Sequence, residues 1–259
     1  MQMQVSIIQA NLYWEDKQAN LRNLEEHIDA IDATDLVVLP EMFSTGFSMR
    51  AQALAEEMDG TAINWMKRKA KEANAAICGS LIIKENGNYY NRFVFVHPTG
   101  EFQHYDKRHL FSLAKEQEHF TAGNSRTIVY YKGWRILLQV CYDLRFPVFA
   151  RYQNDYDLML YVANWPDKRS TAWNSLLKAR AIENMATCIG VNRIGTDKND
   201  ILYTGHSAAY DALGEKIAST NVGNEEVVSV MLNLNAQNQI RQQFNFLNDR
   251  DQYTLLDEG

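Results

Sequence analysis

The chain is poor in the residues that mark linkers and disulfide frameworks, with 4 proline, 13 glycine and 3 cysteine residues among 259. So little proline and glycine leaves no room for long flexible linkers. The odd cysteine count and the lack of a C-x-x-C pair argue against a disulfide scaffold. No apolar run reaches the length of a membrane span, and no basic leader precedes the first strand. We therefore expect a soluble, cytoplasmic protein without membrane contacts.

Several functional motifs are also missing. The chain has 26 Lys and Arg against 32 Asp and Glu, without a basic cluster, so nucleic-acid binding is not expected. It contains neither the phosphate-binding patterns G-x-G-x-x-G and G-x-x-x-x-G-K-[ST] nor the serine motif G-x-S-x-G. His104 and His109 have no partner at a metal-ligand spacing. We expect neither a metal nor a cofactor.

The chain does carry alternating strand and helix patterns, and it is 46% hydrophobic, which suffices for a sizeable core. Helices interleaved with hairpins predict mixed sheets, and so many strands in one domain suggest two sheets face to face with helices outside. No composition shift divides the chain, so residues 1–259 are expected to form a single α/β domain. The polar and aromatic segment 235–259 is interpreted as a tail that packs across a neighbour or a subunit.

The predicted elements have the following bounds. Strands are expected at residues 5–9, 36–39, 76–83, 89–97, 102–105, 127–131, 134–140, 158–163, 187–192, 206–210, 216–219 and 225–232. Helices are expected at residues 20–31, 61–74, 148–154 and 171–184. Asp59 or Thr61 is available as the cap of the second helix.

The segment LLQVCYDLRFP, residues 137–147, reads as a buried strand that runs into Cys141 and then a helix start at Pro147. A reactive side chain where a strand hands over to a helix is how α/β enzymes expose a nucleophile. The alternative is a cysteine that fills the core, which is how we interpret Cys78 and Cys188 in their apolar runs.

Two other predicted strands end on a single ionisable residue. LVVLPE ends at Glu41, and FQHYDK ends at Lys107. Taken alone, Glu41 is as well explained as a loop or helix N-terminal carboxylate, and Lys107 as a solvated turn residue. Sequence distance alone cannot bring either residue to Cys141.

The three segments together resemble a known family. LPEMF at 39–43, YDKRHLF at 105–111 and VCYDLRFP at 140–147 are similar, in order, to the three signature segments of the nitrilase superfamily of carbon–nitrogen hydrolases. The resemblance runs from the first strand to the hairpin at 205–207. Within the superfamily, EMFSTGF at 41–47, YVANWP at 161–166 and ARAIEN at 179–184 look most like the bacterial omega-amidase branch, which removes the terminal amide of 2-oxoglutaramate.

This resemblance implies a four-layer αββα sandwich of two mixed β-sheets with helices outside. It also implies a homodimer formed through an outer helical face, and a small-molecule amide as the substrate.

The resemblance also implies catalytic roles. Glu41 would take the proton of Cys141, later donate a proton to the departing ammonia, and then activate the water that hydrolyses the thioester. Lys107 would face the developing oxyanion together with the backbone N–H of Tyr142, and its charge would favour the thiolate.

A second carboxylate is expected between Lys107 and Cys141, where it would orient Lys107 and the substrate amide. Glu116 is the candidate because it stands seven residues before Gly123, as in many family members. Glu118, two residues further on, is the rival.

Several residues are candidates for the walls of the site. Asn164, Trp165 and Pro166 end a strand and are expected to line the pocket. Phe47 and Phe43 follow the base and are candidates for an apolar wall, although ordinary core packing explains Phe43 equally well.

A dicarboxylate-derived substrate needs a cation for its distal carboxylate. Arg169 is the nearest candidate by sequence, and Arg193 and Lys168 also qualify. Asp143 and Arg145 are interpreted as a structural pair that holds the turn after the nucleophile.

The sequence therefore predicts a cysteine-dependent amidohydrolase that cleaves the terminal amide of a small dicarboxylate monoamide through a thioester. The alternatives are another activity of the same superfamily, an N-carbamoyl hydrolase or a nitrilase, and a non-catalytic binding protein on the same fold.

Overall fold

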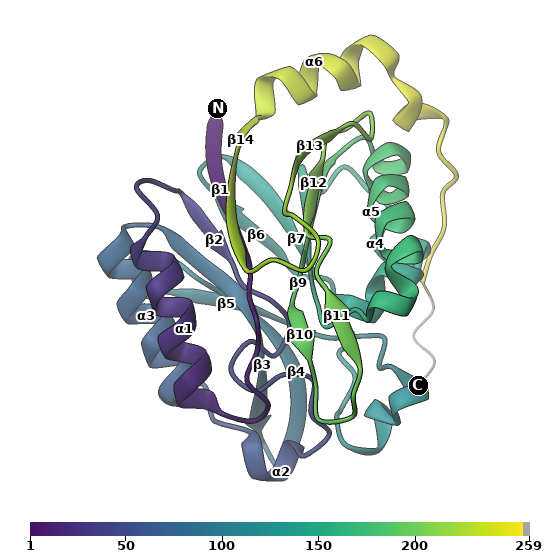
Figure 1. Cartoon of the computed structure of the whole chain (residues 1–259). Helices are drawn as coiled ribbons and strands as arrows, with labels where there is room; N and C mark the ends of the chain where they lie inside the picture. Colours follow the sequence, from purple (N-terminus) through teal and green to yellow (C-terminus); the bar gives the residue numbers. More distant parts are fainter. Residues whose placement is uncertain (256–259) are drawn as a thin grey trace.

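The computed structural model describes residues 1–255, which form two six-stranded sheets stacked face to face with helices on both outer sides (Figure 1). The first sheet has the order β14-β1-β2-β3-β4-β5 and the second the order β13-β12-β9-β8-β7-β6. In each sheet three neighbouring strands are parallel, β1-β2-β3 and β7-β8-β9, and the others pair antiparallel. The predicted mixed αββα sandwich is confirmed.

The elements have these bounds. The first sheet contains β1 (Gln2–Gln9), β2 (Leu36–Val38), β3 (Ala76–Glu85), β4 (Asn88–Val96), β5 (Phe102–Asp106) and β14 (Glu226–Asn233). The second contains β6 (Ile128–Tyr131), β7 (Trp134–Val140), β8 (Leu158–Ala163), β9 (Thr187–Asn192), β12 (Ala208–Tyr210) and β13 (Lys216–Ser219). A separate hairpin joins β10 (Ile194–Thr196) to β11 (Leu202–Thr204). The helices are α1 (Lys17–Asp29), α2 (Ala51–Leu54), α3 (Thr61–Ala73), α4 (Pro147–Ala150), α5 (Ser170–Asn184) and α6 (Leu234–Phe244).

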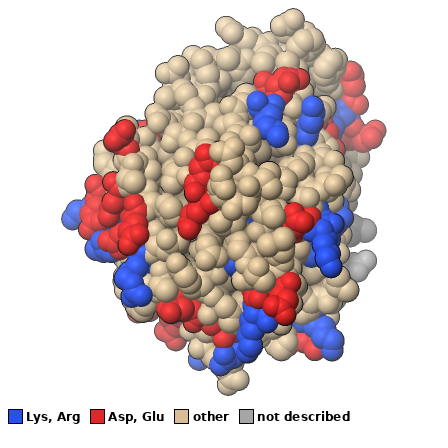
Figure 2. All heavy atoms as spheres, viewed as in Figure 1, with Lys and Arg blue, Asp and Glu red and all other residues tan. Residues whose placement is uncertain are grey.

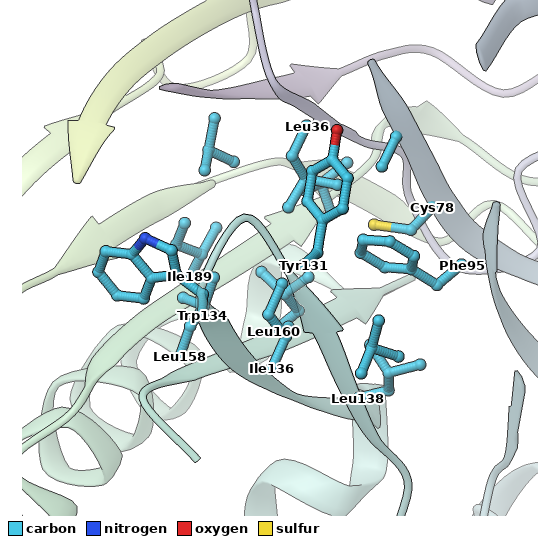
Figure 3. Close-up of a cluster of buried hydrophobic side chains, with 14 of the residues drawn as sticks. Leu36, Cys78, Phe95, Tyr131, Trp134, Ile136, Leu138, Leu158, Leu160 and Ile189 are labelled. Atoms are coloured by element: carbon cyan, nitrogen blue, oxygen red, sulfur yellow. The ribbon is translucent and has the colours of Figure 1, made fainter. Parts of the chain in front are cut away.

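The main core lies between the two sheets. Leu36, Cys78 and Phe95 of the first sheet face aromatic and aliphatic side chains of the second (Figure 3). The side chains of alternate strand residues point outward instead and pack against helices in two further clusters. The helices are α1 and α3 on the first sheet and α5 on the second. This alternation is the two-residue period of a strand that has a buried layer on each face. Cys78 and Cys188 are fully buried, as the core interpretation requires.

A side-chain cap accounts for the early start of α1, and a residue outside the predicted pattern caps α3. α1 begins before the predicted residue 20 because the Asp16 carboxylate accepts a hydrogen bond from the Ala19 N–H, 2.9 Å away. Neither predicted cap serves α3. Its Ala62 N–H donates to the Glu56 carboxylate, at 3.1 and 3.2 Å.

The predicted helix at 148–154 is wrong in length, since α4 ends at Ala150. Beyond it the chain is held in a different way: the Tyr152 N–H donates to Asn184 Oδ1, 2.9 Å away on α5.

The segment predicted as a tail begins as α6, which was not predicted as a helix. Gln237 is buried, accepts from the Thr187 N–H at 2.9 Å and donates to the Asp157 carbonyl at 2.9 Å. Arg241 pairs with the Asp157 carboxylate at 2.8 Å. The start of this segment therefore packs on its own chain, and residues 256–259 lie outside the described part.

The surface is mixed in charge. On the face in Figure 2, basic and acidic side chains are interspersed among uncharged ones. Among the helices described in residues 1–255, none combines the length and the apolar character needed to cross a bilayer.

Candidate active site

Glu41, Lys107 and Cys141 follow β2, β5 and β7, and the structure brings the three side chains together. The Lys107 Nζ donates to Glu41 Oε1 at 3.1 Å, and the Cys141 thiol lies near enough to both groups that their charges act on its pKa. The stacking of the two sheets explains why these side chains lie together. β2 belongs to the first sheet and β7 to the second, and both strands end at the same edge of the sandwich. Glu41 and Lys107 are fully or almost fully buried, whereas Cys141 is partly exposed.

The second carboxylate near Lys107 is Glu116. Its two oxygens lie 3.1 and 2.9 Å from Lys107 Nζ, and Oε2 also accepts from the Phe111 N–H at 2.6 Å. Glu118 points away and pairs with Lys115 at 3.4 Å on the surface. Of the two candidates, only Glu116 lies with the other three side chains.

Two asparagines hold the carboxylates. Asn91 Nδ2 donates to Glu41 at 2.8 Å and to Glu116 at 3.2 Å. The Asn164 N–H donates to Glu41 Oε2 at 2.8 Å, and Asn164 Nδ2 donates to the Glu41 carbonyl at 2.7 Å. Asn91 was not predicted as a site residue. The available signal was a polar residue in line with Phe93 and Phe95 on the inward face of β4.

The charges in this cluster act on one another. Burial, together with the charge of Glu41, raises the pKa of the Cys141 thiol well above its ordinary value, and the opposing effect of Lys107 is smaller. Lys107 favours the thiolate form of Cys141, as expected, but its effect on the thiol pKa is outweighed by burial and the charge of Glu41. Burial would lower the pKa of Lys107, but Glu116 and Glu41 raise it. Burial also raises the pKa of Glu116, against the pull of Lys107.

Cys141 sits on a strained turn. Its φ of 46° lies in the left-handed region, at the start of the short 3-10 helix Cys141–Arg145. Asp143 secures this turn: its carboxylate accepts from the Val140 N–H and the Tyr105 hydroxyl, both at 2.9 Å. The predicted pairing of Asp143 with Arg145 is wrong, because the Arg145 guanidinium lies over Trp165, 5.0 Å from its ring centre.

Cys141 forms part of the wall of a cavity of about 540 Å³. The predicted wall residues Phe47, Asn164, Trp165 and Arg169 all line it, together with Pro166 and Arg145 among others. Phe47 also lies under Lys107, whose Nζ is 5.2 Å from the ring centre. Phe43 does not reach the cavity; it packs in the core at 6.0 Å from Trp65.

Two arginines on the cavity wall have no carboxylate partner within residues 1–255. Arg145 lies over Trp165, and Arg169 lies 5.3 Å from the Phe111 ring centre. Of the other predicted cations, Arg193 is buried behind the wall and donates to the Leu12 carbonyl at 2.8 Å. Lys168 is exposed and does not line the cavity. Within the described residues, the cavity thus offers two guanidinium groups without a carboxylate partner to an anionic ligand.

The part of the chain that the structure describes holds no group of three His, Cys, Asp or Glu side chains arranged to bind a metal ion. The cavity wall carries the Cys141 thiol, and the buried cluster of Glu41, Glu116 and Lys107 adjoins this thiol. The charged side chains on the wall are Glu15, Arg50, Arg145, Arg169, Asp197 and Lys198.

Known proteins share this sequence and fold over nearly their whole length. The profile of the family described as carbon-nitrogen hydrolase matches residues 4–242. Omega-amidase YafV of Escherichia coli K12 is 45% identical over 253 residues, 98% of each chain. The 2-oxoglutaramate amidase of Bacillus subtilis 168 is 29% identical over 256 residues, covering 96% of this chain and 98% of its own. The crystal structure of XC1258 from Xanthomonas campestris, a CN-hydrolase superfamily protein, superposes with a TM-score of 0.95 at 39% identity, covering 99% of this chain and all of the other.

Proposed function

The chain belongs to the carbon–nitrogen hydrolase family, and on that premise we propose that it removes the terminal amide of a small dicarboxylate monoamide such as 2-oxoglutaramate. It is a hydrolase of carbon–nitrogen bonds. The observation that carries the narrower proposal is the composition of one cavity wall, which holds the Cys141 thiol and two arginines that have no carboxylate partner among residues 1–255. The printed activities of the relatives from Escherichia coli and Bacillus subtilis support the same substrate class.

The reaction begins when Cys141 attacks the amide carbonyl. The raised pKa of the thiol means that a neighbouring base must take its proton, and Glu41 is the proposed acceptor because its carboxylate lies close enough to act on the thiol. Collapse of the tetrahedral intermediate breaks the C–N bond. Glu41 returns the proton to the leaving nitrogen, so that ammonia departs and a thioester remains on Cys141.

Hydrolysis of the thioester uses the same base. Glu41 takes a proton from water, the hydroxide adds to the thioester carbonyl, and the proton returns to the Cys141 sulfur as the acid leaves. Both tetrahedral intermediates carry an oxyanion, for which Lys107 and the Tyr142 backbone N–H are the proposed donors. Loss of one such donor typically costs about 10²–10³ in rate. Glu116 holds the Lys107 ammonium at 2.9 Å and keeps it charged.

The distal carboxylate of the substrate is assigned to Arg169, with Arg145 as the second cation. A guanidinium group binds a carboxylate through two parallel hydrogen bonds. Neither arginine forms a salt bridge with a carboxylate of the described residues. Phe47 and Trp165 form the apolar wall beside the reacting carbonyl. Asn164 also faces the cavity, but its donors serve Glu41, so its contribution to the substrate is indirect.

The decisive experiment is ammonia release from 2-oxoglutaramate by the purified protein, with Cys141→Ala as the blank and Cys188→Ala as the matched control. We expect release by the wild type and the Cys188 variant and none by the Cys141 variant. Absence of release above the blank would refute the substrate class and direct the search to carbamoyl compounds and nitriles. Unchanged release by Cys141→Ala would refute the nucleophile.

The arginine assignment has its own test. Arg169→Met is expected to raise KM for 2-oxoglutaramate at least about tenfold, because a charge-assisted hydrogen bond is lost. A simple amide without a carboxylate, such as propionamide, serves as the matched substrate. Equal losses on both substrates would show that Arg169 does not bind the distal carboxylate.

We further propose that the protein is a cytoplasmic homodimer associated through the outer face of α5. Ile182 on this face is exposed and lies against the turn that carries the exposed Leu213, next to Ile217 on β13. A free catalytic thiol suits a reducing compartment. Light scattering tests the oligomeric state, and a monomeric mass would refute the dimer. Cell fractionation tests the cytoplasmic location.

A further inference from the structure

We infer that Asn91 is a positioning residue of this site, whose single amide nitrogen fixes the spacing and orientation of the Glu41 and Glu116 carboxylates. The inference rests on the proposed roles of these two residues. It goes beyond them because it assigns the alignment of both carboxylates to one neutral side chain that does not face the cavity.

The position of Asn91 in the sheet explains its reach. Asn91 lies on β4 opposite Ile82 of β3, on the inward face that carries Phe93 and Phe95 further along the strand. The apolar layer between the sheets ends at this point and the polar cluster begins. The Asn91 carbonyl also accepts from the Lys107 N–H at 3.0 Å, so the same residue holds the backbone of the lysine.

The amide can face the cluster in only one orientation. Its nitrogen carries two hydrogens, one for each carboxylate, at 2.8 Å from Glu41 and 3.2 Å from Glu116. The reverse orientation would place an oxygen against two anionic groups. The Asn91 Oδ1 is buried without a hydrogen-bond partner among the described residues, a cost that the two donated bonds offset.

The cluster needs a second bridge because its charges do not balance. Glu41, Glu116 and Lys107 are all enclosed, so one ammonium is shared by two carboxylates that repel each other. Asn91 supplies the additional donor without adding a charge. The Asn91 amide faces Glu41 after β2 and Glu116 on its 3-10 turn, and the other titratable groups of the cluster are Lys107 after β5 and Cys141 after β7.

Loss of this donor has a defined direction. A hydrogen bond to a carboxylate favours its charged form, so removing the bond favours protonation and moves the acidic limb of the pH profile to higher pH. The misaligned base would slow proton transfer with little effect on binding. We expect kcat to fall about 10- to 100-fold and KM to change by no more than about threefold.

The test uses Asn91→Leu, which has nearly the same size but no donor, and Asn91→Ser, which keeps one short donor. Asn184→Leu is the matched control: Asn184 is also fully buried, accepts from the Tyr152 N–H and donates to the Arg180 carbonyl, each at 2.9 Å, and lies away from the cavity. Melting temperatures establish which variants are folded.

The main readout is the rate of Cys141 alkylation by iodoacetamide as a function of pH, measured by peptide mass. This readout needs no substrate, so it remains informative if 2-oxoglutaramate is not hydrolysed. Turnover of 2-oxoglutaramate is measured beside it.

The inference holds if the folded Asn91 variant shows an alkylation profile displaced to higher pH by about half a unit to one unit while Asn184→Leu keeps the wild-type profile. Asn91→Ser is expected to lie between Asn91→Leu and the wild type, and it decides the matter alone if Asn91→Leu does not fold. A folded Asn91 variant with the wild-type profile overturns the inference. The inference is also overturned if turnover falls no further in the Asn91 variants than in Asn184→Leu.

Discussion

Replacing Lys107 by methionine removes one charge from the most enclosed part of the molecule and keeps most of the side-chain volume. In the wild type, Nζ lies 3.1 Å from Glu41 and 2.9 Å from Glu116, and all three side chains are inaccessible to solvent. Taking one partner from a buried ion pair costs roughly 3–5 kcal/mol, because the remaining charge is left without compensation. For a chain of this size that corresponds to a fall of roughly 6–20 °C in melting temperature.

The loss of stability in Lys107→Met should depend on pH. Burial raises the pKa of Glu116 above its ordinary 4.5, and losing the ammonium raises it further. When folding raises the pKa of a carboxyl group, the folded state binds its proton more tightly than the unfolded state. The free energy of unfolding is then highest below the unfolded-state pKa and falls as the pH rises toward the folded-state pKa. The deficit relative to the wild type is therefore expected to grow from pH 5 to pH 8. Thermal melts of both proteins at several pH values measure it.

Catalysis by the same variant should fall further than its stability explains. Without the proposed oxyanion donor, kcat should drop at least about 10²–10³-fold while KM changes little. Lys69→Met is the matched control, because Lys69 is also buried and pairs with Asp29 and Glu72, but on α3. A Lys107 variant that loses only substrate affinity would instead make the lysine a substrate clamp. A deficit that is constant with pH would contradict the electrostatic argument.

Two other predictions concern individual residues. A small thiol reagent such as iodoacetamide should label Cys141 far faster than Cys78 and Cys188, which are fully buried; equal rates by peptide mass would refute a reactive thiol on the cavity wall. Glu116→Gln should lower kcat about tenfold or more, because the donor end of its amide cannot accept from Lys107, whereas Glu118→Gln on the surface should leave kcat unchanged. The opposite order in steady-state assays would reverse the assignment.

Most of the site residues that could be predicted from the sequence lie at the ends of predicted strands. Glu41, Lys107 and Cys141 each stand directly after an apolar or aromatic strand, and two sheets of the predicted kind place such positions at one edge. Glu116 was identified by its spacing to Gly123, which packs against the Asp106 backbone so closely that a Cβ would lie 2.1 Å from the carbonyl oxygen. Strand boundaries singled out three of these residues, and the resemblance to a known family joined them and added Glu116, which lies on the 3-10 turn Glu116–Glu118 away from any strand.

Contacts that depend on strand order or side-chain orientation could not be predicted in the same way. Asn91 meets Glu41 only because β4 and the end of β2 lie in the same sheet, with β3 between them. Arg145 was paired with Asp143 on proximity in sequence, but the 3-10 turn directs the two side chains apart, one into a hydrogen-bond network and one to the cavity. The cap of α3 comes from Glu56, outside the helix pattern altogether. Each of these contacts depends on orientation, which residue spacing does not encode.

The raised pKa of Cys141 is compatible with nucleophilic catalysis once the total charge of the cluster is considered. With a neutral thiol, Glu41, Glu116 and Lys107 sum to one negative charge. Release of the thiol proton to solvent would create a second negative charge in an enclosed site, and burial together with Glu41 opposes this step. Transfer of the same proton to Glu41 leaves the total unchanged and places the negative charge on sulfur. The site therefore disfavours a free thiolate while permitting one that forms with its base protonated beside it. In the proposed reaction, Glu41 then holds the proton that the departing ammonia requires.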